Sequence, residues 1–217
     1  MIFAKIDFIN LLPFHVFLKK NLSSTQRKQI IEYNKSYPSN INKKFKKRQV
    51  DAAVISSIAS RNCNKCLDMG IVAKGTVDSV LVIPGKFKKD FQSDTSNALA
   101  KVLEIDGQVI IGDKALYEFY NSDTTFIDLA QEWEKKYNLP FVFARLCVNK
   151  HEKYLIKLTQ IFLSSKVFIP QYILEKYAKR SGISKKQIQN YLTKIHYKIG
   201  TKEKQSLKLF LKLSKKL

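Results

Sequence analysis

The amino-acid sequence predicts an α/β protein with a mainly parallel sheet and a helical C-terminal region. Over roughly the first 145 residues, apolar stretches typical of strands alternate with amphipathic stretches typical of helices, and this alternation favours parallel pairing. From about Asn149 onward, apolar residues recur only at helical spacing, so we expect these helices to pack back on the first sheet. With 217 residues, the chain suits one large domain or two small lobes.

The composition indicates a globular protein with a real core. Hydrophobic residues make up 45% of the chain and charged residues 26%. The apolar start is interrupted by Lys5, Asp7 and Asn10, and no later apolar run is long enough to span a bilayer. We therefore expect a cytoplasmic protein that has no signal peptide and does not associate with a membrane.

The cysteines predict neither a disulfide scaffold nor a metal site. Cys63 and Cys66 have the spacing of a metal-ligand or redox pair, but a zinc site needs about four ligands and there is no second pair. We expect Cys63, Cys66 and Cys147 to be ordinary reduced thiols and no metal to be bound. The sequence also lacks a nucleophile elbow, a glycine-rich phosphate loop and a dinucleotide fingerprint.

The first half of the alternating region contains two strands that feed polar residues. Residues 3–9 form the first predicted strand, and Asn10 follows it at the turn into a helix that Pro13 can start. Asn10 is either a ligand-binding side chain or a turn and cap residue. A helix with a basic face is predicted over 36–48, and the short strand at 50–55 is followed by Ser56 and Ser57.

The second half repeats the arrangement. Strands are predicted at 67–72 and 77–83, with Gly75 between them at a point of close approach or positive φ. Strand 109–113 ends in Gly-Asp before a helix over 114–120, Asp128 starts another helix, and 141–144 forms a strand. In the C-terminal region, helices are predicted near 150–164, 170–181, 184–197 and 201–216.

The stretch from Phe91 to Leu103 combines a polar segment with the start of an amphipathic helix. Ser93, Asp94 and Thr95 are N-cap candidates, and apolar residues then follow at helical spacing. Free N–H groups and short hydroxyls at a helix start suit a carboxylate. Such polar groups recur after several predicted strands, so together they indicate binding of a small, anionic molecule between two lobes.

Six segments in order identify a resemblance to a known family. They are 10–13 (Asn-Leu-Leu-Pro), 50–57 (Val-Asp-Ala-Ala-Val-Ile-Ser-Ser), 75–81 (Gly-Thr-Val-Asp-Ser-Val-Leu), 93–99 (Ser-Asp-Thr-Ser-Asn-Ala-Leu), 111–116 (Ile-Gly-Asp-Lys-Ala-Leu) and 139–144 (Leu-Pro-Phe-Val-Phe-Ala). Together they resemble the chorismate dehydratases of the futalosine route to menaquinone. That family implies a two-lobed, periplasmic-binding-protein-like (type II) fold, with the helical C-terminal region packed on lobe one. Lobe one would comprise 1–82 plus 147–217, and lobe two 83–146.

The resemblance also implies a reaction and a set of site residues. Water would be removed from chorismate to give 3-[(1-carboxyvinyl)oxy]benzoate, without a cofactor or metal. Asn10 would orient the reacting ring or the leaving hydroxyl, while Asp113 would be either a base or a helix cap. A substrate carboxylate is the alternative base, since no histidine falls in the matching segments. The substrate-binding residues would be Ser56, Ser57, Gly75, Ser79, Ser93, Thr95, Ser96 and Arg145.

Two other classes of function compete with this interpretation. The net charge of +21 is concentrated in residues 151–217, which hold 16 Lys or Arg against 3 Glu, and residues 181–192 resemble the second half of a helix-turn-helix. A DNA-binding protein is therefore one alternative, and a non-catalytic small-anion binding protein of the same fold is the other. We expect neither nucleic acid nor membrane as a partner, and a monomer or homodimer.

Overall fold

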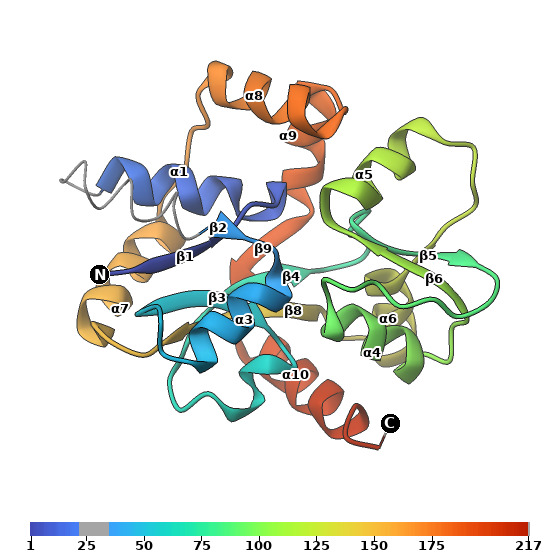
Figure 1. Ribbon diagram of the computed structural model, residues 1–217, viewed down its shortest axis with the longest axis horizontal. Helices are drawn as coiled ribbons and strands as arrows, with labels where there is room; N and C mark the ends of the chain where they lie inside the picture. The colour runs from blue at the N-terminus through green and yellow to red at the C-terminus, as the bar shows by residue number, and fades with distance from the viewer. Residues whose placement is uncertain (22–34, 217) are drawn as a thin grey trace.

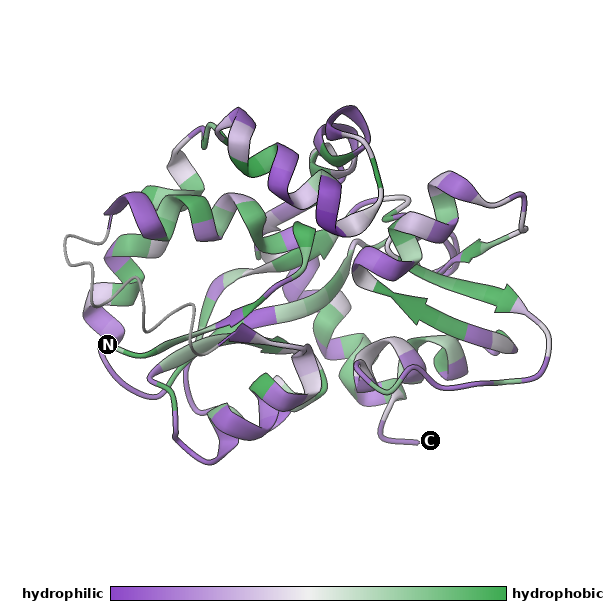
Figure 2. Ribbon diagram, turned by 45° about the horizontal axis from the view of Figure 1, so that its top comes forward, coloured by the Kyte–Doolittle hydropathy of each residue, from purple (hydrophilic) through white to green (hydrophobic). Residues whose placement is uncertain are grey.

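The computed structural model describes residues 1–21 and 35–216, which form two lobes of unequal size (Figure 1). Lobe one contains a six-stranded sheet in the order β2-β1-β3-β8-β4-β9, and lobe two contains a three-stranded sheet in the order β6-β5-β7. Helices pack around both sheets, and the strands consist largely of apolar residues (Figure 2). The predicted α/β class and the division into two lobes are confirmed.

The N-terminal part of the chain builds most of lobe one. Strands β1 and β3 are buried along their whole length, because elements of the same lobe cover both faces of the sheet. The helix predicted over 36–48 is present, and it begins at Pro38. Proline suits this first position because the N–H that it lacks would have no partner within the helix. The elements are β1 (Phe3–Ile6), η1 (Ile9–Leu11), α1 (Leu12–Asn21), β2 (Lys35–Ser36), α3 (Pro38–Lys46), β3 (Ala52–Ser56), η2 (Ala59–Asn62) and β4 (Cys66–Ala73).

The chain then crosses to lobe two, where side chains set two helix starts. Ser93 is the N-cap of α4, and its Oγ accepts a hydrogen bond from the N–H of Ser96 at 3.1 Å. Asp128 caps α6 by accepting from the N–H groups of Ala130 and Gln131. Both caps lie at predicted positions. The elements are β5 (Val80–Pro84), α4 (Asp94–Val102), β6 (Gly107–Ile111), α5 (Gly112–Asn121), β7 (Ile127–Asp128) and α6 (Leu129–Tyr137).

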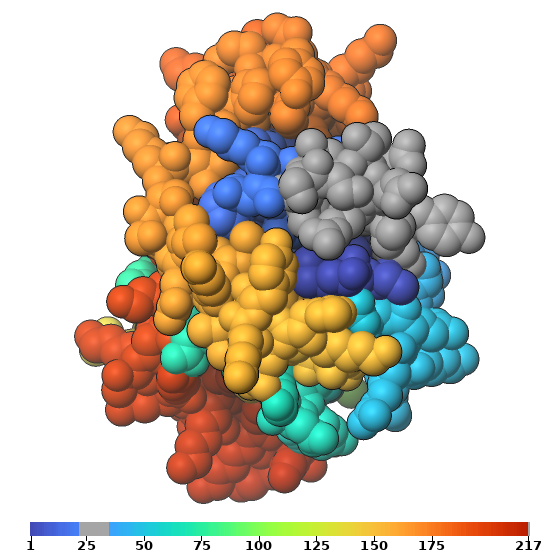
Figure 3. Space-filling view, turned by 90° about the vertical axis from the view of Figure 1, so that its left-hand side faces the viewer, coloured from blue at the N-terminus to red at the C-terminus, as the bar shows by residue number. Residues whose placement is uncertain are grey.

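The chain finally returns to lobe one and stays there. On the side away from lobe two, α7 lies beside the N-terminal segment, with α8 and α10 at opposite ends of the same face (Figure 3). The elements are β8 (Phe141–Val148), α7 (Glu152–Ser164), α8 (Gln171–Ser181), α9 (Lys185–Thr193), β9 (Ile195–Lys198) and α10 (Thr201–Leu213).

The prediction of a mainly parallel sheet is wrong. Among the strands that the structure describes, only β1 pairs in parallel, with β2 and with β3. Strand β8 runs antiparallel to both β3 and β4, and β9 runs antiparallel to β4. In lobe two, β5 is antiparallel to both neighbours. Strand β8 runs antiparallel to its neighbours because the chain enters it from lobe two. A βαβ connection, which would make it parallel, does not precede it.

The prediction that the C-terminal region contains only helices is also wrong. Residues predicted as the end of a helix over 184–197 include β9, whose Ile195 and His196 pair with Ala73 and Val72 at the edge of the sheet. The preceding helix α9 ends at Thr193. Strand β9 forms because its backbone N–H and C=O groups pair with those at the free edge of β4. The spacing of apolar residues does not reveal this pairing.

The sheets place the lobe boundary at different residues from those predicted. All of β5 belongs to the sheet of lobe two and all of β8 to the sheet of lobe one, whereas the predicted limits at 83 and 146 fall inside these strands. We therefore use residues 80–140 as lobe two. Helix α10 spans the junction, since the indole N–H of Trp133 in lobe two donates to Ser206 Oγ at 2.9 Å and its ring meets that of Phe210.

Candidate functional site

A small cavity lies where the two lobes meet. Its volume is about 60 Å³, which is well below the roughly 300 Å³ or more of a typical ligand pocket. The lobes are therefore closed on each other, and a ligand needs them to separate before it can enter. The lining residues come from both lobes and the segment that joins them: Ile6, Phe8, Asn10, Pro38, Ser56, Ile71, Val77, Ser79, Val80, Ser93, Ser96, Ile111, Gly112, Phe143 and Ala144.

Asn10 lines this cavity and carries a buried, unpaired polar atom. It lies in η1, directly after the first strand, and its backbone carbonyl accepts a hydrogen bond from the Tyr197 hydroxyl at 2.6 Å. Its side-chain amide hydrogen-bonds to Tyr191, but Oδ1 is buried and has no partner among the described residues. Such an atom costs stability unless something pairs with it, so its place in a residue that lines the cavity makes Asn10 a candidate ligand contact.

Ser79 also lines the cavity, and it lies on the segment 74–79 that crosses between the lobes. Its Oγ accepts a hydrogen bond from the Tyr191 hydroxyl at 2.9 Å, so its own proton is free to point into the cavity. Tyr191 is fully buried on α9, and this burial raises its pKa well above the usual value. The phenol therefore stays neutral and acts as a hydrogen-bond donor.

The start of α4 supplies the polar wall on the lobe-two side. Ser93 and Ser96 line the cavity, and their hydroxyl oxygens lie 2.8 Å apart. The helix dipole and the free N–H groups of this first turn favour negative charge. On the lobe-one side, Ser56 is held by Asn42, whose Nδ2 donates to Ser56 Oγ at 3.0 Å and whose Oδ1 accepts from the Ser56 N–H at 3.1 Å.

Two predicted residues instead connect the lobes outside the cavity lining. Thr95 Oγ1 accepts a hydrogen bond from the N–H of Ile58 in lobe one at 3.2 Å. Asp113 accepts from the N–H of Ile9 at 3.0 Å and forms an ion pair with Arg180. Burial raises the pKa of Asp113 although Arg180 opposes this shift, and the close guanidinium contact supports the ionised carboxylate.

The remaining predicted residues also lie outside the lining. Ser57 is buried and its hydroxyl donates to the Val142 carbonyl at 2.5 Å. Gly75 has a φ of +76° in the crossing segment, near Glu134. Arg145 lines a separate outer groove with Cys66 and residues of α10. The structure thus brings Asn10, Ser56, Ser79, Ser93 and Ser96 together, and not these three.

Two lining contacts show how closely the lobes approach. Gly112 has a φ of +66°, and a methyl carbon at this position would lie 2.8 Å from Cζ of Phe8 across the junction. The N–H of Gly112 donates to the Ser79 carbonyl at 2.8 Å. Closure therefore depends on a residue without a side chain at the start of α5.

Tyr191 and Tyr197 are site residues that the sequence did not identify. Both belong to the C-terminal region, and from α9 and β9 they hydrogen-bond to the lining residues Ser79 and Asn10. Nothing in their neighbourhood distinguishes them from other aromatic residues on a helical apolar face. The segment 181–192, predicted as the second half of a helix-turn-helix, covers the end of α8, the turn after it and most of α9, and Tyr191 of α9 contacts the site.

The chemistry of the cavity is that of neutral hydrogen-bonding groups. Within residues 1–21 and 35–216, no lysine, arginine, histidine or carboxylate lines it. Hydroxyls, an amide and a helix N-terminus can bind carboxylates and polarise a hydroxyl group, but they cannot act as a general base near neutral pH. Among the same residues, no helix is long and apolar enough to cross a membrane.

Three comparisons with known proteins complete this description. The model of a family described as "Menaquinone biosynthesis" matches residues 1–103 and 89–216. A Campylobacter jejuni protein named chorismate dehydratase is 49% identical over 221 aligned positions, covering 100% of this chain and 99% of its own.

Two solved structures share the fold at 13% identity. One, from Archaeoglobus fulgidus, has a TM-score of 0.69 and covers 99% of this chain and 96% of its own. The other, from Candida albicans, is described as having the generic periplasmic binding protein fold; its TM-score is 0.52, with 99% and 90% covered.

Proposed function

This chain belongs to the menaquinone biosynthesis family, and we propose that it is a chorismate dehydratase. The proposal is supported by the full-length relative of that name and by the family's fold. The structural observation that carries it is the buried, unpaired Oδ1 of Asn10 in an interlobe cavity with neutral polar walls. Such a site binds a small polar anion and presents an amide to it, as the dehydration requires.

The reaction is an elimination that needs no oxidant. A proton leaves the ring carbon of chorismate that bears the ether, hydroxide leaves the neighbouring carbon, and the ring becomes aromatic. The products are 3-[(1-carboxyvinyl)oxy]benzoate and water. Because aromatisation drives the step, the protein has to hold the ring, assist the leaving hydroxyl and provide a place for the proton.

The two carboxylates of chorismate fit the two walls of the cavity. Ser93, Ser96 and the first turn of α4 receive one carboxylate in lobe two. Ser56 in lobe one is available for the other, held in position by Asn42. Binding a single molecule with groups from both lobes stabilises the closed arrangement, since each lobe alone supplies part of the contacts.

Asn10 and Ser79 act on the hydroxyl that leaves. Oδ1 of Asn10 accepts a hydrogen bond from the substrate hydroxyl in the ground state and so fixes the orientation of the C–O bond. The Ser79 hydroxyl donates to the departing oxygen, and Tyr191 donates to Ser79 from behind. This chain of donors places positive polarity where negative charge develops, which is the usual route to a lower barrier.

The proton is taken by a carboxylate of the substrate itself. No carboxylate or imidazole among the described residues lines the cavity, and Asp113 is engaged by Ile9 and Arg180. A substrate carboxylate held close to the ring is a base of suitable strength once the surroundings exclude water. Asp113 then acts by holding the lobes together.

The direct test is incubation of the purified full-length protein with chorismate, with substrate and product followed by chromatography. We expect chorismate to disappear as an equal amount of the enolpyruvyl benzoate forms. Binding without turnover would instead support the non-catalytic binding protein. Salt-dependent retention on DNA together with no turnover would support the DNA-binding alternative.

Several further properties follow from the same proposal. The enzyme is a hydro-lyase acting at the first step of the futalosine route, in the cytoplasm, where chorismate is made. It works without cofactor, membrane or nucleic acid. As a monomer or homodimer it has a complete cavity in each chain, since both lobes come from one polypeptide. Light scattering of the purified protein gives its oligomeric state.

A further inference from the structure

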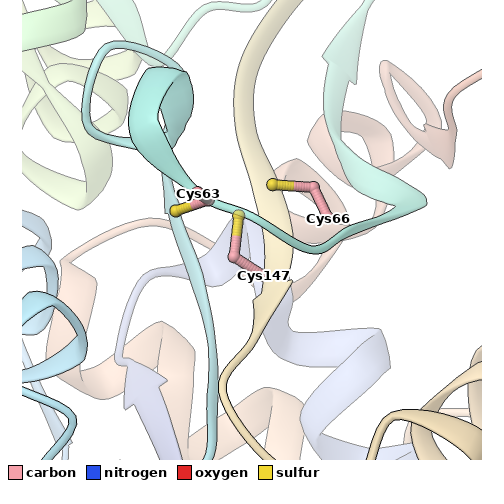
Figure 4. A group of neighbouring side chains, drawn as sticks. All are labelled: Cys63, Cys66 and Cys147. Carbon is pink, nitrogen blue, oxygen red and sulfur yellow. The ribbon is translucent and has the colours of Figure 1, made fainter.

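Three cysteines that are scattered along the sequence meet in lobe one. The Sγ atoms of Cys63, Cys66 and Cys147 all lie within 4.8 Å of one another. Figure 4 shows that the sulfurs come from the loop after η2, from the start of β4 and from β8. The fold thus supplies the third ligand that the Cys-x-x-Cys pair lacks in the sequence.

The backbone holds this group in place. Cys66 and Cys147 face each other as register partners of the antiparallel β4–β8 pair, so their side chains share one face of the sheet. Cys63 ends η2 and is tied to it by a backbone hydrogen bond from its N–H to Ser60. Since regular structure fixes all three residues, little conformational entropy is lost when their sulfurs bind one atom.

A cationic side chain lies beside this group. Arg145 lies two residues before Cys147, on the same face of β8, and it lines the outer groove together with Cys66. Cys147 is fully buried, whereas Cys63 and Cys66 are half-buried, so the group is accessible from one side.

We propose that Cys63, Cys66 and Cys147 form a three-thiolate binding site for a thiophilic metal ion such as Zn²⁺ or Cu⁺. Soft thiolate ligands select these cations over Mg²⁺ and Ca²⁺. Among the described residues the group includes no histidine or carboxylate, so a fourth position at the ion is left to a solvent or small-molecule ligand. Because the metal binds thiolates, binding releases the protons of the cysteine thiols, and the affinity for the metal therefore increases with pH.

The site is separate from the dehydratase chemistry. None of the three cysteines lines the interlobe cavity. The ion would bridge η2, β4 and β8, of which β4 leads directly into the segment that crosses to lobe two. We therefore expect metal to raise the stability of lobe one while turnover of chorismate proceeds without it.

The test is metal binding by reduced, chelator-stripped full-length protein. Zn²⁺ is titrated against a chromophoric chelator, Cu⁺ against a copper-specific one, and Cd²⁺ reports thiolate ligation by its ultraviolet charge-transfer band. We expect one ion per chain, three titratable thiols that the ion protects, and the band. Cys63→Ser and Cys66→Ser should weaken binding at least about tenfold. Asn64→Ala, an exposed change in the same loop, should leave binding unchanged.

Clear outcomes would overturn the proposal. They are binding of less than one ion per chain by the reduced protein, or equal affinity in the serine variants and the unchanged protein. Circular dichroism and chorismate turnover check that each variant is folded. Cys147→Ala replaces the fully buried thiol, and if it does not fold, the two half-buried positions still decide the result.

Discussion

The hydroxyl of Tyr191 donates a hydrogen bond to Ser79 Oγ at 2.9 Å across 112 residues of sequence. This contact connects the C-terminal helix α9 to the segment that joins the lobes, at the wall of the cavity. It leaves the Ser79 hydroxyl proton free for a ligand. Helix α9, which belongs to the basic C-terminal region, thus contributes a residue that contacts the site.

Tyr191→Phe removes this donor and keeps the ring in place. We expect kcat for chorismate to fall about tenfold with little change in KM, because the donor acts on the departing oxygen and not on the substrate carboxylates. Tyr137→Phe on α6, where the ring packs on Trp133, is the matched control and should keep full activity. Equal kcat in the two variants would contradict the role given to Tyr191.

Asn10→Ala separates function from stability. The change deletes a buried oxygen that has no partner, and it also removes the hydrogen bond between the side-chain amide and Tyr191. Because these two effects oppose each other, the free energy of unfolding should change by no more than about 1 kcal/mol. Turnover of chorismate should fall about 100-fold, the loss typical of an amide that contacts the reacting group. Asn10→Asp should also be impaired, since it adds a negative charge facing a dianion. Unchanged turnover in both variants would remove Asn10 from the mechanism.

Gly112→Ala tests whether closure of the lobes is required. A methyl group there would lie 2.8 Å from the Phe8 ring in the other lobe, so the closed arrangement would be forced open. We expect KM to rise about tenfold, a free-energy change of about 1.4 kcal/mol. Gly85→Ala has a positive φ of +145° but no atom within 4 Å, so it controls for backbone strain. Similar KM values in both variants would show that contact with Phe8 does not matter.

Asp7 should make stability depend on acid pH. Burial opposes its ionisation, but the cations of Lys5 and Arg180 hold its pKa at about 2, below the ordinary 3.8. Because the pKa is lowered in the folded state, its contribution is present above pH 4 and is lost as the pH falls from about 4 to about 2. The difference is at most about 2 kcal/mol.

Urea unfolding at several pH values measures this contribution. In Asp7→Asn the loss of stability over that interval should be smaller than in the unchanged protein. Asp106→Asn alters an exposed carboxyl and should not change the profile. If the Asp7→Asn and Asp106→Asn profiles coincide, the Asp7 carboxylate does not provide the acid sensitivity.

Local signals in the sequence account for the parts that were predicted correctly. The N-caps Ser93 and Asp128 and the start of α3 at Pro38 follow from neighbouring residues. Pairing directions are not local: β8 and β9 take theirs from the chain's path through lobe two and from the free edge of β4. Sequence spacing therefore predicted the elements but not how the later strands pair.

The residues of the site likewise divide into those that local sequence predicted and those that only tertiary structure brings together. Ser56 ends a strand, Ser79 precedes one, and Ser93 and Ser96 lie at a helix start that the sequence predicts. Asn10 lies in the turn after β1, so the meeting of these polar residues at the cavity was predictable. The sequence did not show which way the side chain of each strand residue points. Arg145 of β8 was predicted to bind substrate, but it lines the outer groove and not the cavity. Tyr191 and Cys147 join their groups only through tertiary structure.

The position of β8 has a consequence for biosynthesis of the protein. This strand lies between β3 and β4 in lobe one, yet the ribosome makes it only after the whole of lobe two. Until residue 148 has emerged, the first sheet has a gap at its centre and two exposed strand edges, which are prone to pair wrongly. Folding of the larger lobe must therefore wait for the smaller one. Nascent chains that stall between 80 and 140 should be the species that chaperones protect.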